Sequence, residues 1–407
     1  MHSNSRYRFV IFISIILVRI SVGILWASAG PLLPLIIQEY DLSRSVAGWY
    51  ASIAPLAIAA VSLPVNTLVS RFGLKRMLTI GSFLLAMGVF AFFTSGYFPL
   101  LFFRACFALG TAIIIPVATA ITAEWFDARE LPVVNGIGMS FINIGNGIAF
   151  AVTIPIANAL AWNAPIILYG AFALVGAVAW LILGRESEKT PVVTEPGINQ
   201  VLGKRPDLSF RQILTNRAAL MMTLSVTVAW ALGNAIGSWL PDYYYSVFNI
   251  ALDKASSILT IATVGSTIAS IAGGILSNRL GRRKPFMIAA GLGTGLAALF
   301  AVLFNNPAAI YTGITFFGIF GGICVSSWFT IPMEIPGMSV RSGVIVIAMM
   351  QVGGNLGNFI SPLVVGALVD STGSYLPGFL IFIILSFGMM VAGLLLPETG
   401  PAARTQS

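Results

Sequence analysis

Twelve long apolar runs, separated by short polar segments, dominate the sequence. A helix needs about 20 apolar residues to cross the roughly 30 Å of hydrocarbon in a bilayer. Each run has that length, and a helix satisfies its own backbone polar groups in lipid. The pattern predicts an all-α membrane protein with transmembrane helices at residues 9–37, 46–70, 76–96, 98–122, 132–158, 163–184, 218–247, 255–278, 285–304, 308–332, 342–369 and 375–396.

The composition supports lipid as the solvent of most of the chain. Hydrophobic residues make up 57% of the 407 residues and charged residues only 9%, whereas an average soluble domain carries roughly 25% charged residues. The cysteines, Cys106 and Cys324, fall inside apolar runs and indicate no disulfide framework. His2 is the single histidine, so a histidine-based metal site is excluded. We expect neither a metal nor a cofactor.

Lysine and arginine are distributed unevenly between the segments that connect the runs. With the N-terminus inside, only Arg44 and Lys254 of the 22 basic residues fall in outer segments, and Arg19 and Arg104 lie within spans. Cytoplasmic segments of membrane proteins carry such an excess of Lys and Arg. The net charge of +8 thus follows from orientation in the bilayer and needs no nucleic-acid partner. We expect a multi-pass protein of the cell membrane with both termini in the cytoplasm.

One longer polar segment, residues 185–217, divides six predicted spans from six. We therefore expect a six-helix bundle over residues 1–184, a cytoplasmic linker over 185–217 and a second six-helix bundle over 218–407. Within the linker, residues 208–214 predict a short amphipathic helix on the membrane surface.

Two local patterns recur at nearly the same offset. Residues 70–76 read Ser-Arg-Phe-Gly-Leu-Lys-Arg after the second span, and residues 278–284 read Asn-Arg-Leu-Gly-Arg-Arg-Lys after the eighth. Residues 143–148 of the fifth span (Asn-Ile-Gly-Asn-Gly-Ile) resemble residues 355–360 of the eleventh (Asn-Leu-Gly-Asn-Phe-Ile). Both pairs link spans that are six apart, which indicates two six-helix pseudo-repeats. Transporters built from parallel repeats bind substrate near the midplane between them.

With this duplicated loop, the chain resembles the major facilitator superfamily over essentially its full length. The family's loop after spans two and eight reads Gly-x-x-x-Asp-Arg-x-Gly-Arg-Lys/Arg, and here Ser70 and Asn278 replace the acid. The resemblance implies that these loops act in a conformational switch and that spans one, four, seven and ten line the substrate cavity. The first copy has Asn66 for the first Gly of the pattern. The matching residues are Arg71, Gly73 and Lys75 in the first copy and Gly274, Arg279, Gly281, Arg282 and Arg283 in the second, and those assigned to the switch are Arg71, Gly73, Gly274, Arg279, Gly281 and Arg282. We expect a monomer.

Within the superfamily, three segments are weakly similar to the cyanate and 2-nitroimidazole permease group. They are residues 30–34 (Gly-Pro-Leu-Leu-Pro), Gln351 with Gly354, and residues 370–374 (Asp-Ser-Thr-Gly-Ser). The span-one arginine of that group sits about one helical turn closer to its Gly-Pro pair than Arg19 does.

Arg19 lies about ten residues into the first span, about 15 Å along a helix and so close to the bilayer midplane. A charge at that depth costs several kcal/mol unless it faces a partner or water. The acids fall outside the spans or near their ends, the nearest being Asp242, Glu334 and Asp370. An unpaired arginine that faces a cavity is suited to bind an anion. The alternative is an arginine that snorkels or caps carbonyls of a neighbouring helix.

Two further residues of the N-terminal half are candidates for the same cavity. Trp26 follows Arg19 by seven residues, on the same helical face, and its indole is a plausible pocket wall. Arg104 lies about six residues into the fourth span from the outer side. It is either a second anion contact or an arginine that snorkels to the interface.

Asparagines and other polar side chains in the spans form a second group of candidates. Asn143 and Asn146, like Asn355 and Asn358, are three residues apart and share a helix face. Buried amides in lipid need partners, so these residues either bind substrate or bond across a helix seam. The candidates of the C-terminal half that remain are Trp230, Asn234, Trp328 and Gln351.

These features predict a transporter that moves a small anion, either an organic carboxylate or a small oxoanion, by alternating access. Efflux of drugs or hydrophobic compounds is an alternative, although such a pump is expected to carry an intramembrane Asp or Glu. A non-transporting receptor on the same fold is another. An enzyme is not expected, because the spans hold no nucleophile, acid–base or metal constellation.

Overall fold

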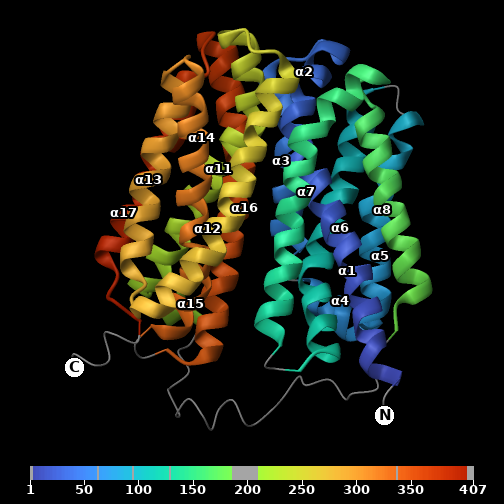
Figure 1. Ribbon diagram of the computed structural model, residues 1–407, viewed down its shortest axis with the longest axis vertical. Helices are drawn as coiled ribbons and strands as arrows, with labels where there is room; N and C mark the ends of the chain where they lie inside the picture. The colour runs from blue at the N-terminus through green and yellow to red at the C-terminus, as the bar shows by residue number, and fades with distance from the viewer. Residues whose placement is uncertain are drawn as a thin grey trace. The chain divides into compact units, whose positions relative to one another are not determined.

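The computed structural model describes residues 3–61, 64–93, 96–127, 130–185, 210–335 and 338–400, and this part of the chain is helical throughout (Figure 1). The helices before the predicted linker are α1 (Ser3–Ala27), α2 (Ala29–Tyr40), α3 (Arg44–Val61), α4 (Pro64–Phe72), α5 (Leu74–Ala86), the 3-10 helix η1 (Met87–Phe93), α6 (Tyr97–Trp125), α7 (Leu131–Ala159) and α8 (Ala164–Leu183). Those after it are α10 (Phe210–Leu214), α11 (Arg217–Phe248), α12 (Leu252–Leu280), α13 (Lys284–Leu303), α14 (Pro307–Ile323), α15 (Val325–Glu334), α16 (Val340–Thr372) and α17 (Leu376–Leu395).

The predicted all-α membrane fold is confirmed. Among the described residues, 12 helices are long and apolar enough to cross a membrane. They coincide with the twelve predicted spans, although the first begins earlier, at Ser3. Of the predicted amphipathic segment, α10 covers residues 210–214, while residues 208 and 209 lie outside the described part of the chain together with most of the predicted linker.

Within the described residues, three spans depart from a continuous α-helix in ways that the apolar pattern does not predict. The first span breaks at Ser28, between α1 and α2. Pro31 follows the break and has no N–H to donate to the carbonyl of Ala27. The tenth span breaks at Cys324, and the third ends in η1. The break at Ser28 matters for the site, because it leaves carbonyls at the end of α1 open to other donors.

The described helices fall into two compact units. Unit 1 consists of Met1–Thr194 with Ser238–Thr260, and unit 2 consists of Glu195–Gly237 with Ile261–Ser407. The C-terminal end of α11 and the N-terminal end of α12 are therefore part of unit 1. The bundle boundaries predicted at residues 184 and 218 stay a prediction.

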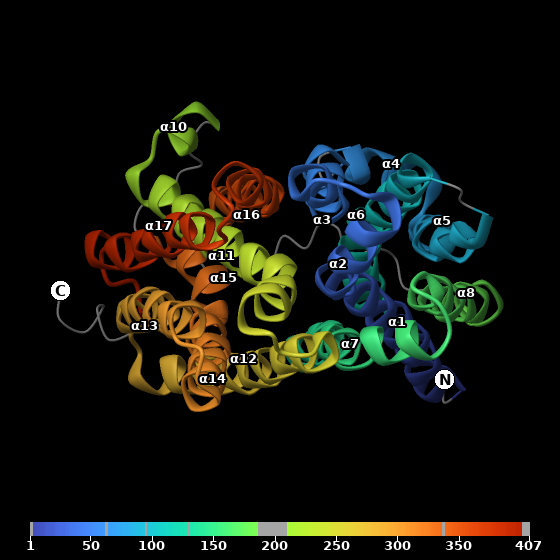
Figure 2. The same cartoon turned by 90° about the horizontal axis from the view of Figure 1, so that it is seen from above.

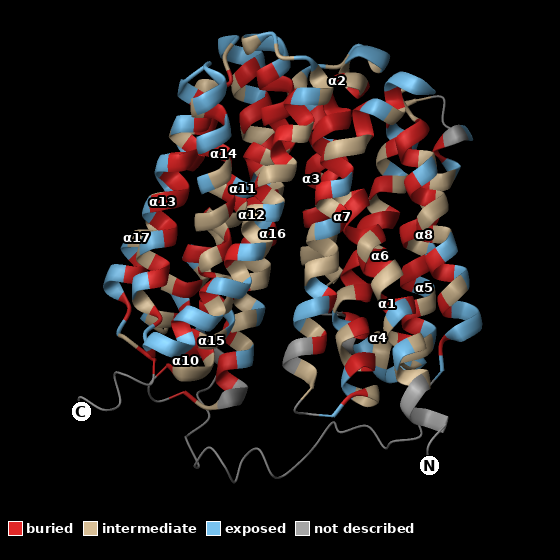
Figure 3. Ribbon diagram, in the orientation of Figure 1, coloured by how far each residue is buried: buried red, intermediate tan, exposed pale blue. Residues whose placement is uncertain are grey.

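In unit 1, α1 packs against α7 and α8, and α8 also packs against α5 (Figure 2). Glycine permits the close approach of α1 to α7, since a methyl group at Gly23 would collide with the carbonyl oxygen of Ile142. Buried residues follow the inner faces of α1 and α6 (Figure 3). This packing places the middle of α1 in the interior of unit 1.

Side chains fix the parts of α11 and α12 that belong to unit 1. Arg44 Nε of α3 lies 3.3 Å from Asp242 Oδ2 of α11. The hydroxyl of Ser256 in α12 donates to the carbonyl of Phe150 in α7 at 2.6 Å. The Asp242 side chain is only 5% exposed, so this carboxylate has a cationic partner as a buried charge requires.

In unit 2, α13 lies between α14 and α17 (Figure 2). The α16 helix packs against α15 and α17, and Gly357 of α16 abuts the Thr227 carbonyl of α11 closely enough to exclude a methyl group.

Candidate functional site

Arg19 lies on α1 in the interior of unit 1, with only 1% of its surface exposed. Its Nη2 donates to Thr119 Oγ1 of α6 at 3.1 Å. Its Nε and Nη1 are buried and have no hydrogen-bond partner among the described residues. A buried polar group without a partner is costly, and a guanidinium more so because it carries a full charge. The site therefore holds a cation whose donors are only partly satisfied.

Two neighbours shape the space around this guanidinium. Thr119 donates its own hydroxyl proton to the Ile115 carbonyl at 2.9 Å, which leaves its oxygen free to accept from Arg19. Gly138 of α7 faces the other side, where a methyl group would collide with Arg19 Nη1. A glycine at this position is needed for the guanidinium to lie against the backbone of α7.

No described carboxylate neutralises Arg19. Ion pairs among the described residues include Arg8 with Glu130, Arg44 with Asp242 and Arg283 with Glu334, and none of them involves Arg19. An isolated buried cation is expected to bind an anion or water, and a planar guanidinium suits carboxylates and other oxoanions because it presents several N–H donors in one plane.

Arg104 on α6 is also buried, at 5% exposure, but its donors are used. Nε donates to the Tyr50 carbonyl at 3.2 Å, Nη1 to the Leu25 carbonyl and Nη2 to the Trp26 carbonyl at 3.2 Å. The guanidinium carbon also lies 4.6 Å from the centroid of the Phe107 ring. Leu25 and Trp26 lie in the last turn of α1, just before its break at Ser28, so Arg104 caps that helix. Backbone carbonyls thus use the donors of Arg104, and its role as a second anion contact stays a prediction.

The other candidates of unit 1 lie on α1 and α7. Trp26 is half-buried, and its carbonyl is the one that Arg104 binds. Asn143 is half-buried. Asn146 has a buried Oδ1 without a partner among the described residues, and its backbone nitrogen lies next to Gly23 of α1. Asn146 is therefore the asparagine of this pair with an unused acceptor in the α1–α7 seam.

In unit 2 two of the predicted side-chain amides, those of Asn234 and Asn355, donate to backbone carbonyls. Asn234 Nδ2 of α11 donates to the backbone carbonyl of Asn358 in α16 at 2.6 Å. Asn355 Nδ2 donates to the Gln351 carbonyl of its own helix at 2.9 Å. The Asn234 bond fastens α11 to α16, as amides do between membrane helices, whereas the Asn355 bond lies within α16.

The predicted aromatic residues of unit 2 are part of its packing. The Trp230 ring lies directly over Gly354 of α16. Trp328 of α15 is buried in an apolar cluster, and its Nε1 has no partner in the described part of the chain. Of this pair, Trp328 thus keeps a donor that is not used.

The two copies of the repeated loop share a backbone feature. Gly73 before α5 has a φ of 80° and Gly281 before α13 has a φ of 62°, a left-handed conformation that favours glycine. Gly274 packs against the hydroxyl of Ser326 in α15. The basic side chains of these loops that were predicted to act in the switch, Arg71, Arg279 and Arg282, are all exposed.

A side-chain network joins the second loop to α15 and to the residues after α17. Arg283 donates through Nη2 to Glu334 Oε1 at 3.2 Å and through Nη1 to Asn278 Oδ1 at 2.8 Å. The backbone N–H of Arg283 donates to Glu398 Oε1 at 2.7 Å. Asn278, which stands where the family pattern has an acid, thus accepts a hydrogen bond from Arg283. In unit 1, an ion pair forms between Arg8 near the start of α1 and Glu130 just before α7, at 2.9 Å.

Comparisons with known proteins agree with this architecture. The sequence model of the Major Facilitator Superfamily matches residues 12–255 and 234–407. The chain belongs to the Major Facilitator Superfamily. The resemblance noted in the repeated loops is therefore confirmed, whereas similarity to the cyanate and 2-nitroimidazole permease group stays a prediction.

Relatives within the superfamily are named as transporters. A probable sulfoacetate transporter of Cupriavidus necator is 23% identical over 362 residues, covering 84% of this chain and 83% of that protein. A probable L-galactonate transporter of Escherichia coli is 24% identical and covers 83% of this chain and 78% of that protein. This superfamily member is a multi-pass membrane transporter and not an enzyme.

A solved structure shares the superfamily fold. It is a bacterial homologue of the human lysosomal transporter Spinster, in an inward-facing and unoccupied conformation. The two structures superpose with a TM-score of 0.75 at 14% sequence identity, covering 95% of each chain. At this identity the likeness concerns the fold alone.

Sequence reasoning located Arg19 but missed the neighbours that define its site in this superfamily member. Thr119 is one of several hydroxyl residues in α6, and Gly138 is one of 41 glycines. Both are recognised as neighbours of Arg19 only once α1 is packed against α6 and α7. The sequence does show two glycines close together near the start of α7, Gly136 and Gly138. It does not show which of the two faces α1.

Proposed function

We propose that this protein transports a small organic carboxylate or small oxoanion across the membrane by alternating access, with Arg19 as the principal contact for the anion. One observation carries the proposal: a guanidinium that is 1% exposed keeps two nitrogens without partners among the described residues. An anion that enters the site would accept from those nitrogens and neutralise the buried charge.

The relatives support the substrate class. Sulfoacetate and L-galactonate, named for two of them, are both small organic acids. Each carries at least one acidic group whose oxygens match guanidinium donors. Efflux of hydrophobic or cationic compounds has less support, since the buried carboxylate Asp242 is already paired with Arg44.

A ligand-stabilisation screen of the purified protein tests the proposal. Sulfoacetate, L-galactonate, simple carboxylates and inorganic oxoanions are compared with cations and neutral solutes at constant ionic strength. We expect one or more anions to raise the thermal unfolding midpoint, because a ligand that binds only the folded state stabilises it. Equal stabilisation by cations or neutral solutes would contradict the anion assignment.

Counterflow in proteoliposomes then separates a transporter from a receptor. Vesicles preloaded with the stabilising anion should accumulate the same labelled anion from outside. Binding without counterflow would identify a receptor on the transporter fold.

The orientation is inferred from the Lys and Arg distribution, and reporter fusions test it. Fusions at Gln200 and after Ser407 should report cytoplasm, whereas a fusion at Asn163 should report the outside. Opposite sidedness of Gln200 and Ser407 would contradict the arrangement of two six-helix halves.

A further inference from the structure

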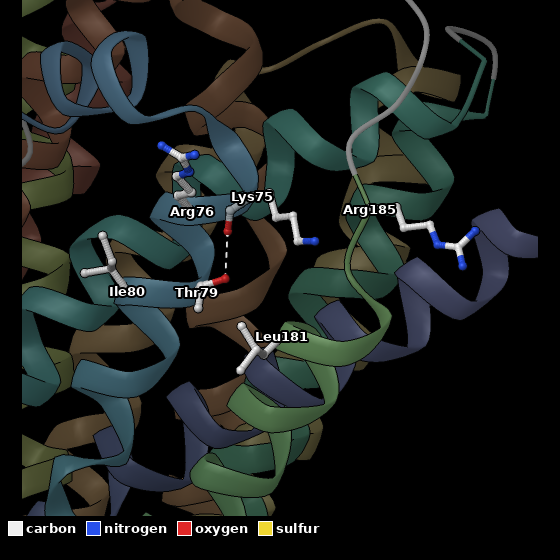
Figure 4. A pocket seen from close by; sticks show the side chains of 6 residues that line it. All are labelled: Lys75, Arg76, Thr79, Ile80, Leu181 and Arg185. Carbon is white, nitrogen blue, oxygen red and sulfur yellow. Dashed lines mark hydrogen bonds between the residues drawn. The ribbon is translucent and has the colours of Figure 1, made fainter.

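A second cationic site lies at the end of unit 1 that carries the N-terminus, away from Arg19. A pocket of about 620 Å³ opens between the start of α5 and the end of α8 (Figure 4). Its lining residues are Lys75, Arg76, Thr79, Ile80, Leu181 and Arg185. Three of these six residues are basic and none is acidic.

The walls of this pocket are held in place by hydrogen bonds. The indole Nε1 of Trp180 in α8 donates to the Lys75 carbonyl at 3.3 Å. The hydroxyl of Tyr7 donates to the Leu183 carbonyl at 2.6 Å, and the Arg185 guanidinium carbon lies 4.5 Å from the centroid of the Tyr7 ring. The start of α5, the end of α8 and the start of α1 therefore form one fixed frame.

The cations of the pocket are not neutralised within the described part of the chain. Lys75, Arg76 and Arg185 take part in none of the ion pairs found there. The hydroxyl of Thr79 is already bonded to the Lys75 carbonyl at 2.9 Å, as the dashed line in Figure 4 shows. The polar character of the pocket is thus positive, which favours an anionic ligand.

The arrangement of the three cations favours a ligand with spread charge. In Figure 4 the Lys75 side chain extends into the space between the helices, while those of Arg76 and Arg185 point away to either side. The cations surround the opening and do not converge on one point. This geometry fits a headgroup at the pocket mouth better than a single enclosed anion.

The remaining lining is apolar and continues onto the lipid-facing surface. Ile80 is 44% exposed and Leu181 is 49% exposed, and Ile182 beside it is 71% exposed. A free phosphate would gain nothing from these side chains, whereas acyl chains would bury them. Basic pockets between transmembrane helices at the cytoplasmic side are suited to anionic lipid headgroups.

We propose that the pocket between α5 and α8 binds the headgroup of an anionic phospholipid, with Lys75, Arg76 and Arg185 as the cationic contacts and Ile80 and Leu181 against its acyl chains. The site is separate from the anion site at Arg19, so it does not depend on the substrate proposed above.

Thermal unfolding of the detergent-solubilised protein tests this proposal with three probes: a short-chain phosphatidylglycerol, a short-chain phosphatidylcholine and inorganic phosphate. Phosphatidylglycerol should raise the unfolding midpoint of the wild type more than phosphatidylcholine does, and phosphate should not raise it. Equal effects of the two lipids would overturn the proposal. Stabilisation by phosphate equal to that by phosphatidylglycerol would show a free-anion site and overturn the lipid assignment.

Substitutions test which residues contact the lipid headgroup. In Lys75→Gln/Arg185→Gln, the affinity for phosphatidylglycerol should fall by about fivefold for each cation removed. The matched control is Arg211→Gln/Arg217→Gln, which removes two exposed cations of unit 2 and should bind as the wild type does. Equal loss in the control would show a nonspecific charge effect and overturn the site.

A charge-retaining variant covers the case in which the glutamine variant does not fold. Lys75→Arg/Arg185→Lys keeps both cations and should retain the preference for phosphatidylglycerol. A separate variant, Leu181→Asn, should weaken binding of the lipid without changing the charge of the pocket. Wild-type lipid affinity in Leu181→Asn would contradict the role of the apolar lining.

Discussion

Arg19 and Arg104 are both buried arginines in apolar helices of unit 1, but their surroundings differ. Arg104 donates to three backbone carbonyls, those of Leu25 and Trp26 at the end of α1 and that of Tyr50 in α3. Arg19 donates to one threonine hydroxyl and keeps two nitrogens without partners in the described residues. Burial alone therefore does not mark a binding residue. What distinguishes the two arginines is whether the fold itself satisfies the guanidinium.

The difference follows from the break in the first span. Carbonyls at a helix end have no partner within the helix, and the break at Ser28 places such carbonyls beside Arg104. Arg19 lies two turns earlier, where the carbonyls of α1 are used within the helix. Its guanidinium consequently depends on two other helices, on Gly138 of α7 for space and on Thr119 of α6 for an acceptor.

The largest expected effect is that of Arg104→Ala on folding. Removing the guanidinium takes a donor away from the buried carbonyls at the end of α1, and a buried carbonyl left without any donor costs about 1–3 kcal/mol. We expect a large fall in the thermal unfolding midpoint, with anion binding retained by the protein that folds. Normal stability together with lost anion binding would instead make Arg104 a ligand contact.

The next effect concerns the space beside Arg19. In Gly138→Val the side chain would collide with Nη1 and displace the guanidinium, so anion affinity should fall about tenfold or more, equivalent to about 1.4 kcal/mol. Gly136→Val is the matched control, because a side chain there meets nothing within 4 Å. Anion affinity should be measured by titration of both variants. Similar losses in the two would show that Gly138 has no specific role in positioning Arg19.

A smaller effect is expected for Thr119→Val. The substitution keeps the shape of the side chain but removes the acceptor of Arg19 Nη2, so the guanidinium loses one fixed contact and the anion affinity should fall by about fivefold. Thr122→Val on the same helix is the control, since that hydroxyl bonds the Ala118 carbonyl of α6. Unchanged affinity in Thr119→Val would show that Arg19 is positioned without Thr119.

The smallest effect, on transport of the anion, is expected from an imposed pH gradient. Arginine stays protonated throughout the physiological range, so neither buried arginine can carry a proton through the cycle. Glu334 is held by Arg283 at 3.2 Å. We expect counterflow of a strong-acid anion without a pH gradient, and no accumulation when one is imposed. Accumulation that is lost in Glu334→Gln would show proton coupling and contradict this expectation.

The sequence predicts the fold well because its information is local. Each span is a continuous apolar run, and the length of that run fixes where the helix begins and ends. The breaks at Ser28 and Cys324 were not predicted, since they fall inside such runs. The shared left-handed backbone of Gly73 and Gly281 gives the repeated loop motif a structural counterpart.

The site was only partly predictable, because its composition depends on packing between helices. The depth of Arg19 in an apolar run predicts an anion-binding cation, and the structure adds that two of its nitrogens lack partners among the described residues. The roles of Arg104 and Asn234 could not be read from the sequence, since their partners are backbone carbonyls of other helices. Every backbone has such carbonyls, so no residue type reveals where one is left open.

The most direct test of the account is a titration of wild type, Arg19→Ala and Arg19→Lys with the anion that stabilises the wild type most. A charge-assisted hydrogen bond contributes about 1.5–3 kcal/mol, so Arg19→Ala should lose anion binding by roughly ten- to a hundredfold or more. Arg19→Lys should restore only part of it, because lysine keeps the charge but not the planar set of donors. If Arg19→Ala binds the anion as tightly as the wild type, Arg19 is not the anion contact and the central claim is wrong.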